Sequence, residues 1–223
     1  MSLKTSLTLL LILLLSSTQG FSDEQDNLDS VVDGVQKKYE QINNFHASFI
    51  QDVEVKALNK VQKADGEVWF KKPGKMRWNY NTPNKDQIVS DGKTFWFYDE
   101  EEKQVIETPI NQVSETQSTT TLLSGLGNIK ELFNASFTEP GDISPNGSYL
   151  IDLMPKGDEE YNKVTISVDK KDMMVNTIYL YDPFGNLTTM KLEDIKVDGA
   201  VSDSLFDFKV PSGVEVVKPP SFR

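Results

Sequence analysis

Apolar side chains near the start of the chain recur with the spacing of a helix. They are separated by 3, 1, 3, 4 and 3 positions, at Leu28, Val31, Val32, Val35, Tyr39 and Ile42. This period places them on one face of an amphipathic helix, and Asp23 or Ser22 is available to cap it. Gly34 lies inside the segment and costs about 1 kcal/mol relative to alanine, so the helix is expected to depend on tertiary packing.

After residue 44 the period changes to two. Phe45, Ala47 and Phe49 occupy alternate positions, which predicts a strand. Further strands are predicted at residues 66–72, 75–81, 87–90, 93–99, 104–108, 135–139, 149–154, 163–168, 175–181 and 186–197. The links between the early strands are too short for helical crossovers, so these neighbours are expected to pair antiparallel.

The middle of the chain interrupts the strands. Residues 118–126, with Leu122, Leu123 and Leu126, predict a short apolar helix, and residues 128–133 predict another. The pattern as a whole predicts a mainly β fold with a few helices and about 10–11 strands in one antiparallel sheet. A sheet of that strand number tends to curl.

The first 20 residues have the layout of a secretory signal peptide. Lys4 precedes an apolar run from residue 7 to residue 15, and Thr18 and Gly20 fit a small-x-small cleavage site. The run is too short to span a bilayer, which takes about 20 residues. We therefore expect cleavage near Gly20, export to the periplasm and a single mature domain over residues 21–223.

Hairpin geometry decides which aromatic side chains share a face. A three-residue loop at residues 73–75 places Val68, Phe70, Lys72, Met76, Trp78 and Tyr80 on one side. A two-residue turn at residues 73–74 instead joins Trp69 to Met76 and Trp78, because a one-residue slip exchanges the faces.

The next hairpin adds three more side chains to the predicted inner face. A two-residue turn at Asp91 and Gly92 pairs Ser90 with Lys93. If these polar residues face water, the inward side chains are Val89, Trp96 and Tyr98. Two interpretations of the inward aromatics remain open: they are ordinary core, or they line a cavity on the concave face.

Composition excludes several classes of chemistry. The chain has no cysteine and one histidine, His46, so disulfides, thiolate sites and multi-histidine metal sites are absent from the sequence. The formal charge is −11, and without residues 1–20 it becomes 22 − 34 = −12. Such acidity argues against nucleic-acid binding. Because no catalytic motif is present, we expect neither an enzyme nor a cofactor.

Four ordered motifs resemble a known family. They are residues 45–51 (FHASFIQ), 66–78 (GEVWFKKPGKMRW), 90–99 (SDGKTFWFYD) and 206–214 (FDFKVPSGV). In this order they resemble the periplasmic outer-membrane lipoprotein carrier family (LolA) over essentially the whole mature chain. The resemblance implies an incomplete, half-closed β-barrel, covered by the N-terminal helix and a short central helical lid, with an apolar cavity.

The resemblance also implies a function and partners. The family takes lipoproteins by their acyl chains from an inner-membrane ABC-type releasing complex to an outer-membrane lipoprotein receptor of similar fold. The receptor needs a lipidated cysteine, and this chain has none, so a soluble carrier, expected to be a monomer, is favoured. The alternative is a periplasmic protein-interaction or lipoprotein-sensing domain with a filled core.

The implied acyl-chain cavity comprises Val68, Phe70, Met76, Trp78, Tyr80, Val89, Trp96, Tyr98, Leu122, Leu123 and Leu126. Lys72 stands where the family has an arginine that ties the barrel to its lid, and lysine lacks the planar fork of arginine. Our hypothesis is a latch: in the empty form, Lys72 bonds the backbone around residues 122–126 and the leucines fill the mouth. Ligand would displace them, which lowers affinity and permits release.

Overall fold

The structure is a computed structural model that describes residues 27–112, 126–138, 147–157 and 161–217. The first half contains α1 (Leu28–Gln41), β1 (Asn44–Val55), η1 (Lys56–Leu58), β2 (Lys60–Lys71), β3 (Lys75–Thr82), β4 (Gln87–Asp91), β5 (Thr94–Asp99), β6 (Gln104–Pro109) and η2 (Ile110–Gln112). The second half contains η3 (Leu126–Asn128), α3 (Ile129–Leu132), β7 (Phe133–Phe137), β8 (Tyr149–Pro155), β9 (Lys163–Val168), β10 (Val175–Tyr181), β11 (Leu187–Val197), η4 (Asp203–Phe206) and β12 (Glu215–Val217).

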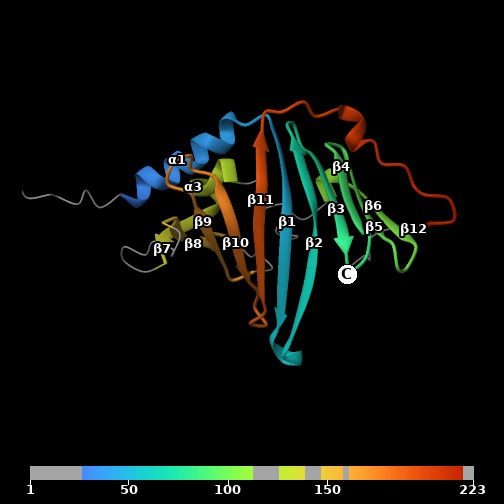
Figure 1. Cartoon of the computed structure of the whole chain (residues 1–223), viewed down its shortest axis with the longest axis horizontal. Coiled ribbons are helices and arrows are strands. Elements are labelled where there is room, and N and C mark those ends of the chain that lie inside the picture. Colours follow the sequence, from blue (N-terminus) through green and yellow to red (C-terminus); the bar gives the residue numbers. More distant parts are fainter. Residues whose placement is uncertain (1–26, 113–125, 139–146, 158–160, 218–223) are drawn as a thin grey trace, which may run out of the picture.

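All of these strands belong to one sheet of 12 strands, in the order β12-β6-β5-β4-β3-β2-β1-β11-β10-β9-β8-β7. Neighbours pair antiparallel except β12 and β6, which pair parallel. The long strands β11, β1 and β2 stand side by side at the centre, and the two flanks bend away from them (Figure 1). In the described residues the edge strands β12 and β7 do not pair with each other, so the sheet stays open. The predicted mainly β, unclosed fold is confirmed.

Three details of the strand prediction differ from the structure. β7 begins at Phe133, two residues before its predicted start, so Phe133 belongs to the strand and not to the predicted helix. β2 begins at Lys60, six residues before the predicted start, because its polar first half pairs with β1 as an extended hairpin. β12 has only three residues and follows a proline- and glycine-containing turn, so it has too few positions to show alternation.

Helix α1 begins later than its predicted caps. Asn27 is the N-cap: its side-chain oxygen accepts a hydrogen bond from the Asp29 amide at 3.0 Å, and its carbonyl accepts one from the Val31 amide. The prediction of Asp23 or Ser22 as the cap is therefore wrong. The apolar stripe itself is confirmed, since Val31, Val32 and Val35 are buried.

The main hydrophobic core lies on the concave face of the sheet, under α1 and the short helical turns η3 and α3. Alternate residues of β1 and β7–β11 point into it, which follows from the period of two along each strand. The predicted helix at residues 128–133 corresponds to α3, whose Ile129 is buried. Most of the predicted helix at residues 118–126 lies outside the described residues. In the described part of the chain, no helix is both long enough and apolar enough to cross a membrane.

Gly66 on β2 permits a close approach at the centre of this core. A Cβ atom at this position would lie 2.1 Å from the backbone oxygen of Asn79 on β3 and 2.8 Å from the ring of Phe49. The register of β2 and β3 shifts next to it, between Asp65 and Gly66. The ring of Phe49 therefore covers a glycine that the sheet requires here.

Candidate functional site

The β2–β3 hairpin sets the inner face of the sheet. Lys71 pairs with Lys75, so the loop has three residues, 72–74, and the two-residue alternative is excluded. The loop lies one residue earlier than predicted, which changes the pairing partners without exchanging the faces. Val68, Phe70, Met76, Trp78 and Tyr80 consequently share the concave face, as the sequence predicts.

The β4–β5 hairpin brings different residues to this face from those predicted. Ile88 pairs with Trp78 on one side and with Phe97 on the other, and Phe97 pairs in turn with Ile106 on β6. Phe95 pairs with Ser90, which lies opposite Met76. We call the four apolar side chains contributed by β4, β5 and β6 the inner strip: Ile88, Phe95, Phe97 and Ile106.

The predicted inward positions of Val89, Trp96 and Tyr98 are wrong. Val89 pairs with Arg77 and Trp96, and Tyr98 follows Trp96 by two positions, so all three lie on the outer face. The error comes from the expectation that Ser90 faces water. Ser90 is fully buried on the concave side.

Ser90 can be buried because the turns at the end of the hairpins satisfy its hydroxyl group. The Oγ donates to the Gly74 carbonyl at 3.2 Å and accepts from the Gly92 amide at 3.1 Å. A hydroxyl with both partners supplied loses little on burial. Polarity alone therefore indicates the wrong face for this strand.

The inner strip is the less covered part of the concave face. The main core includes Trp78 and Val68 but not Phe95, Phe97 or Ile106. The four side chains of the inner strip are each only half-buried. Together they present an apolar surface that continues from the core toward the edge strands.

Trp78 joins this surface to the core. Its ring contacts Phe49 edge-on at 5.1 Å between centroids and Phe70 at 6.1 Å. The indole is fully buried, and its Nε1 has no hydrogen-bond partner among the described residues. An unpaired buried donor costs about 1–3 kcal/mol, so a ligand oxygen that reached Trp78 would recover part of that free energy.

Lys72 ties the hairpin loop to α1. Its Nζ donates to the carbonyl oxygens of Tyr39 and Glu40, both at 2.8 Å, at the C-terminal end of the helix. These are carbonyls that the helix leaves unpaired, and the helix dipole favours a cation there. We call this pair of bonds the latch. The predicted partner of Lys72, the backbone around residues 122–126, lies mostly outside the described residues, so that bond stays a prediction.

The predicted lid leucines are described only in part. Leu122 and Leu123 lie outside the described residues. Leu126 opens η3, is fully buried and belongs to the main core beside α1. Its side chain therefore helps to fill the helix-covered half of the concave face.

Two half-buried tyrosines lie on α1 and β3. The Tyr39 hydroxyl accepts a hydrogen bond from the Val175 amide on β10 at 3.2 Å, and burial raises the pKa of this hydroxyl. On β3, burial and then the charge of Asp86 raise the pKa of Tyr80 to about 12. Both hydroxyls therefore remain protonated and neutral at physiological pH.

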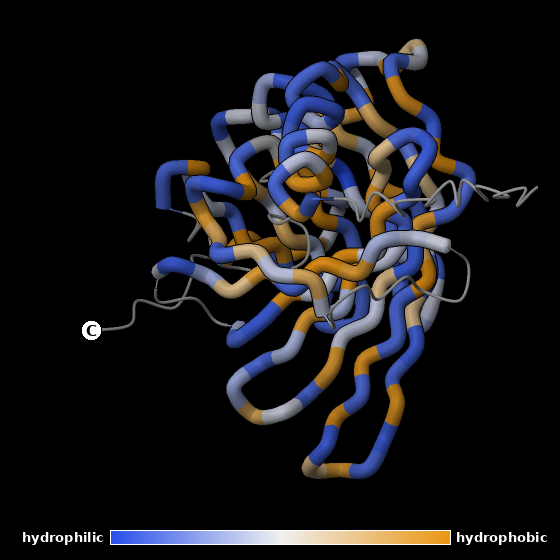
Figure 2. Tube along the Cα trace, turned by 90° about the vertical axis from the view of Figure 1, so that its left-hand side faces the viewer, coloured by the Kyte–Doolittle hydropathy of each residue, from blue (hydrophilic) through white to orange (hydrophobic). Residues whose placement is uncertain are grey.

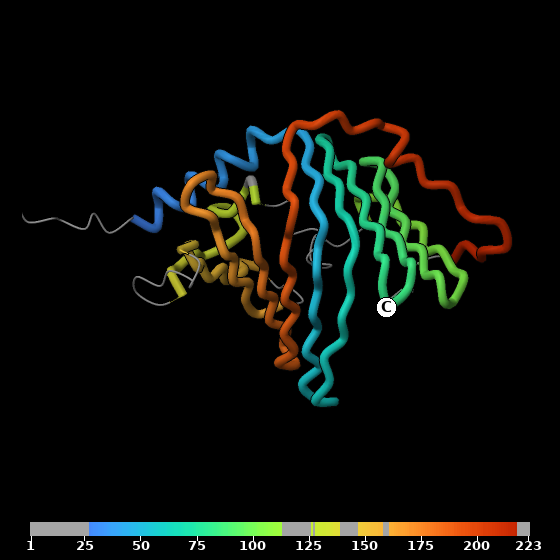
Figure 3. Tube along the Cα trace, in the orientation of Figure 1, coloured from blue at the N-terminus to red at the C-terminus, as the bar shows by residue number. Residues whose placement is uncertain are grey.

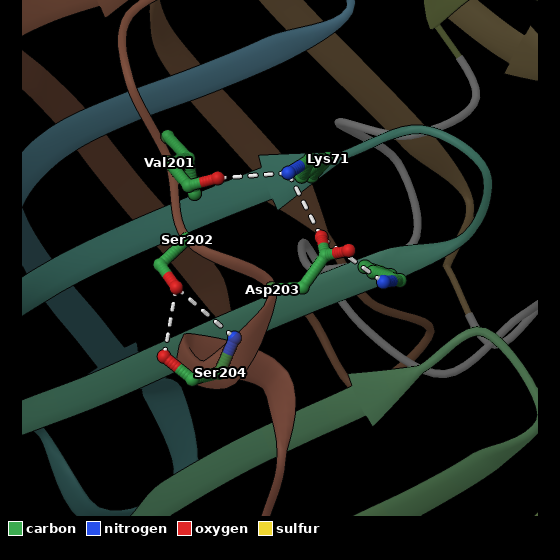
Figure 4. Close-up of polar contacts among 6 residues, drawn as sticks. Lys71, Val201, Ser202, Asp203 and Ser204 are labelled. Carbon is green, nitrogen blue, oxygen red and sulfur yellow. Dashed lines mark hydrogen bonds and ion pairs between the residues drawn. The ribbon is translucent and has the colours of Figure 1, made fainter.

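A segment after β11 crosses the outer face of the same hairpin. We call residues 201–208 the strap. Lys71 donates to the Val201 carbonyl at 2.8 Å and pairs with Asp203 at 2.8 Å, and Lys75 pairs with Asp203 at 3.1 Å (Figure 4). The two lysines lower the pKa of Asp203. The hairpin is thus held by α1 on one side and by the strap on the other.

The strap also explains why the outer face is apolar. Arg77 donates to the Leu205 carbonyl at 3.0 Å, and Phe206 is buried. Trp96 lies 5.8 Å from Phe208 between ring centroids and donates from Nε1 to Glu107 at 3.0 Å. Trp96 therefore packs under the strap, and the pattern of β5 alone does not reveal that the strap covers it.

Sequence reasoning missed the inner strip, although its signal was present. Phe95 and Phe97 alternate with Trp96 and Tyr98, so both faces of β5 are apolar. The choice between faces required the partner strand, and Ile88 opposite Trp78 would have settled it. His46 lies on the outer face, where its ring stacks on Trp69 at 4.7 Å.

Comparison with known proteins gives a consistent result. A family model described as outer membrane lipoprotein carrier protein LolA matches residues 40–209. An outer-membrane lipoprotein carrier protein of Legionella pneumophila (strain Corby) is 30% identical over 212 residues, which cover 94% of this chain and 97% of that protein. One of Edwardsiella ictaluri is 32% identical over 181 residues, covering 81% and 83%.

A solved structure supports the fold. The crystal structure of an uncharacterized conserved protein from Thermus thermophilus superposes with a TM-score of 0.56 at 12% identity. The match covers 85% of this chain and 98% of that one.

Proposed function

Because the chain belongs to the LolA family of outer-membrane lipoprotein carrier proteins, we propose that it binds the acyl chains of lipoproteins on its concave face and carries them between membranes. The observation that carries this proposal is the inner strip, a half-buried apolar surface that continues into the core at Trp78. The reaction is binding and release, with no covalent step.

Acyl chains need such a surface in order to leave a membrane. Each buried CH₂ group is worth about 0.8 kcal/mol, so exposing one chain of roughly sixteen carbons to water costs about 12 kcal/mol. A carrier must offset most of this by burial. The inner strip offers the first contacts, and Phe70, Met76, Trp78 and Tyr80 extend the apolar surface along β2 and β3.

Release requires that the empty form also be stable. The latch between Lys72 and the end of α1 holds the helix beside the concave face. A ligand that displaces the helix must break the latch, so part of its binding free energy is consumed and the affinity falls. The carrier can then pass its cargo to an acceptor that binds more tightly.

The cellular location, the partners and the oligomeric state are also proposals. The leader-like residues 1–20 support export to the periplasm with cleavage near Gly20. The partners would be an inner-membrane ABC-type releasing complex as donor and an outer-membrane lipoprotein receptor as acceptor. We expect the carrier to act as a monomer, without a metal or cofactor.

A transfer assay tests the proposal. Vesicles loaded with a triacylated lipoprotein are incubated with the purified protein, and the supernatant is examined for a soluble 1:1 complex by native mass spectrometry. We expect such a complex, and we expect Met76→Glu to prevent its formation because a charge then lies on the concave face. The control is Ile50→Glu, which adds the same charge on the outer face of β1, where Ile50 is exposed. No complex with the unmodified protein would refute the function, and complex formation by Met76→Glu would remove Met76 from the binding surface.

A further inference from the structure

Two turns extend beyond the rest of the sheet at the end opposite to the latch. One joins β1 to β2 and contains η1, and the other joins β10 to β11 (Figures 1 and 3). We call residues 55–61 and 183–186 the tip. Because β2 runs from the tip to the loop at residues 72–74 over 12 residues, the two ends are about 35–40 Å apart.

The tip exposes three apolar side chains to solvent. Leu58 is 67% exposed, Val61 is 48% exposed and Phe184 is 85% exposed. Figure 2 shows a hydrophobic segment at the end of each of the two turns. Single exposed apolar residues are ordinary, but a phenylalanine and a leucine on adjacent turns at one extremity form a patch that fits an interaction surface.

The two turns are fixed to each other. The Lys56 amide donates to Asn186 Oδ1 at 3.0 Å, and the Lys56 side chain passes beside Gly185. Asp182 accepts from the amides of Phe184 and Asn186 at 2.9 and 2.8 Å, which fixes the second turn. The apolar side chains are thus presented by a preformed structure that would lose little backbone entropy on binding.

The charge of the tip is opposite to that of the whole chain. Within residues 55–61 and 183–186 the charged side chains are Lys56 and Lys60, whereas the chain carries −11. Neither lysine forms an ion pair with a described residue. Two carboxylates flank the tip, Glu54 at the end of β1 and Asp182 before the second turn, and Asp182 accepts the amide bonds named above while keeping its charge.

From these observations we propose that the tip docks on the surface of a bilayer containing anionic phospholipid. Phenylalanine and leucine inserted among head groups, with lysines beside them, is the arrangement that binds such surfaces. The acidic remainder would be repelled, so contact would be confined to the tip and reversible. The long strands would then stand upright on the membrane with the latch end directed away from it.

Vesicle sedimentation tests this proposal. The full chain, collected from the periplasmic fraction of the expressing host, is mixed with vesicles of phosphatidylglycerol and phosphatidylcholine, and with vesicles of phosphatidylcholine alone. The variants are Leu58→Ser, Phe184→Ser, Lys56→Gln and Lys60→Gln. The matched controls are Val210→Ser, which removes another exposed apolar side chain, and Lys93→Gln, which removes an exposed lysine away from the tip.

We expect salt-sensitive binding to the anionic vesicles that falls about tenfold for each apolar variant and about fivefold for each lysine variant. The controls should bind as the unmodified protein does. Equal binding to both kinds of vesicle, or binding that tip variants leave unchanged, would overturn the proposal. A separate delivery assay with lipoprotein adds one outcome: tip variants that bind vesicles normally but fail to deliver cargo would also overturn the proposal, because the tip would then contact a protein. No lipoprotein is present in the sedimentation assay, so a failure there leaves the acyl-chain proposal intact.

Discussion

Replacing Lys72 with methionine tests the latch, because the change keeps an unbranched side chain of nearly the same length and removes its charge. The Nζ bonds to the Tyr39 and Glu40 carbonyls are both 2.8 Å long and are both lost. The C-terminal carbonyls of α1 then face water. The contacts of Lys71 and Lys75 with the strap stay in place, since these side chains lie on the other side of the hairpin.

We expect a small change in free energy that lowers the stability of the fold and raises the affinity for ligand. Lys72 is exposed, so two hydrogen bonds to helix carbonyls contribute about 1 kcal/mol after screening by water. Losing them should lower Tm by about 2–4 °C for a chain of this size. If ligand must break the latch, its removal should strengthen binding of an apolar ligand about fivefold.

The assay is a titration with a fluorescent apolar probe, together with a thermal melt of the same samples. Lys75→Met is the matched control, because it removes the same charge from the facing strand but loses a contact with Asp203 on the outer face. We expect its probe affinity to stay within about twofold of the unmodified protein. If Lys72→Met lowers Tm while the affinity for the probe does not rise, the latch only stabilises the fold, and ligand binding does not require it to break.

Two further predictions concern the supports of the site. Gly66→Ala should destabilise the protein by more than about 2 kcal/mol in urea unfolding, because its Cβ would lie 2.1 Å from the Asn79 oxygen, and an unchanged midpoint would show that β3 can move. The strap should loosen at low pH, because Lys71 and Lys75 lower the pKa of Asp203. The contribution of the Asp203 carboxylate to the stability of the strap is therefore complete above the ordinary carboxyl pKa of about 4, and it is lost as the pH falls through the lowered pKa. The Ser204 amide resonance should report this transition in an NMR titration, and Asp203→Asn should abolish it; a titration identical in both proteins would contradict the assignment.

Much of the fold could be predicted because local patterns and tertiary structure agree. The stripe from Leu28 to Ile42 has one period and one buried face, and α1 follows it from Leu28 to Gln41. The strands with clear alternation, such as β1, appear where predicted. What the pattern could not supply was the start of β2, whose polar half pairs with β1 away from the core.

The site was harder to predict because β5 is apolar on both faces. Trp96 and Phe97 are adjacent aromatics that serve different surfaces, one under the strap and the other in the inner strip. The strap comes from residues more than 100 positions later, so no local pattern announces it. Likewise, the burial of Ser90 depends on turn atoms that satisfy its hydroxyl and that the strand pattern does not reveal.

The same pair of residues gives the most direct test of the central claim, that acyl chains bind on the concave face. Affinity for a triacylated peptide is measured for Phe97→Ser and Trp96→Ser. Loss of a phenylalanine that the ligand covers should weaken binding at least about tenfold, whereas Trp96→Ser should lower Tm and leave affinity within about twofold. Equal losses, or a larger loss for Trp96→Ser, would contradict the account.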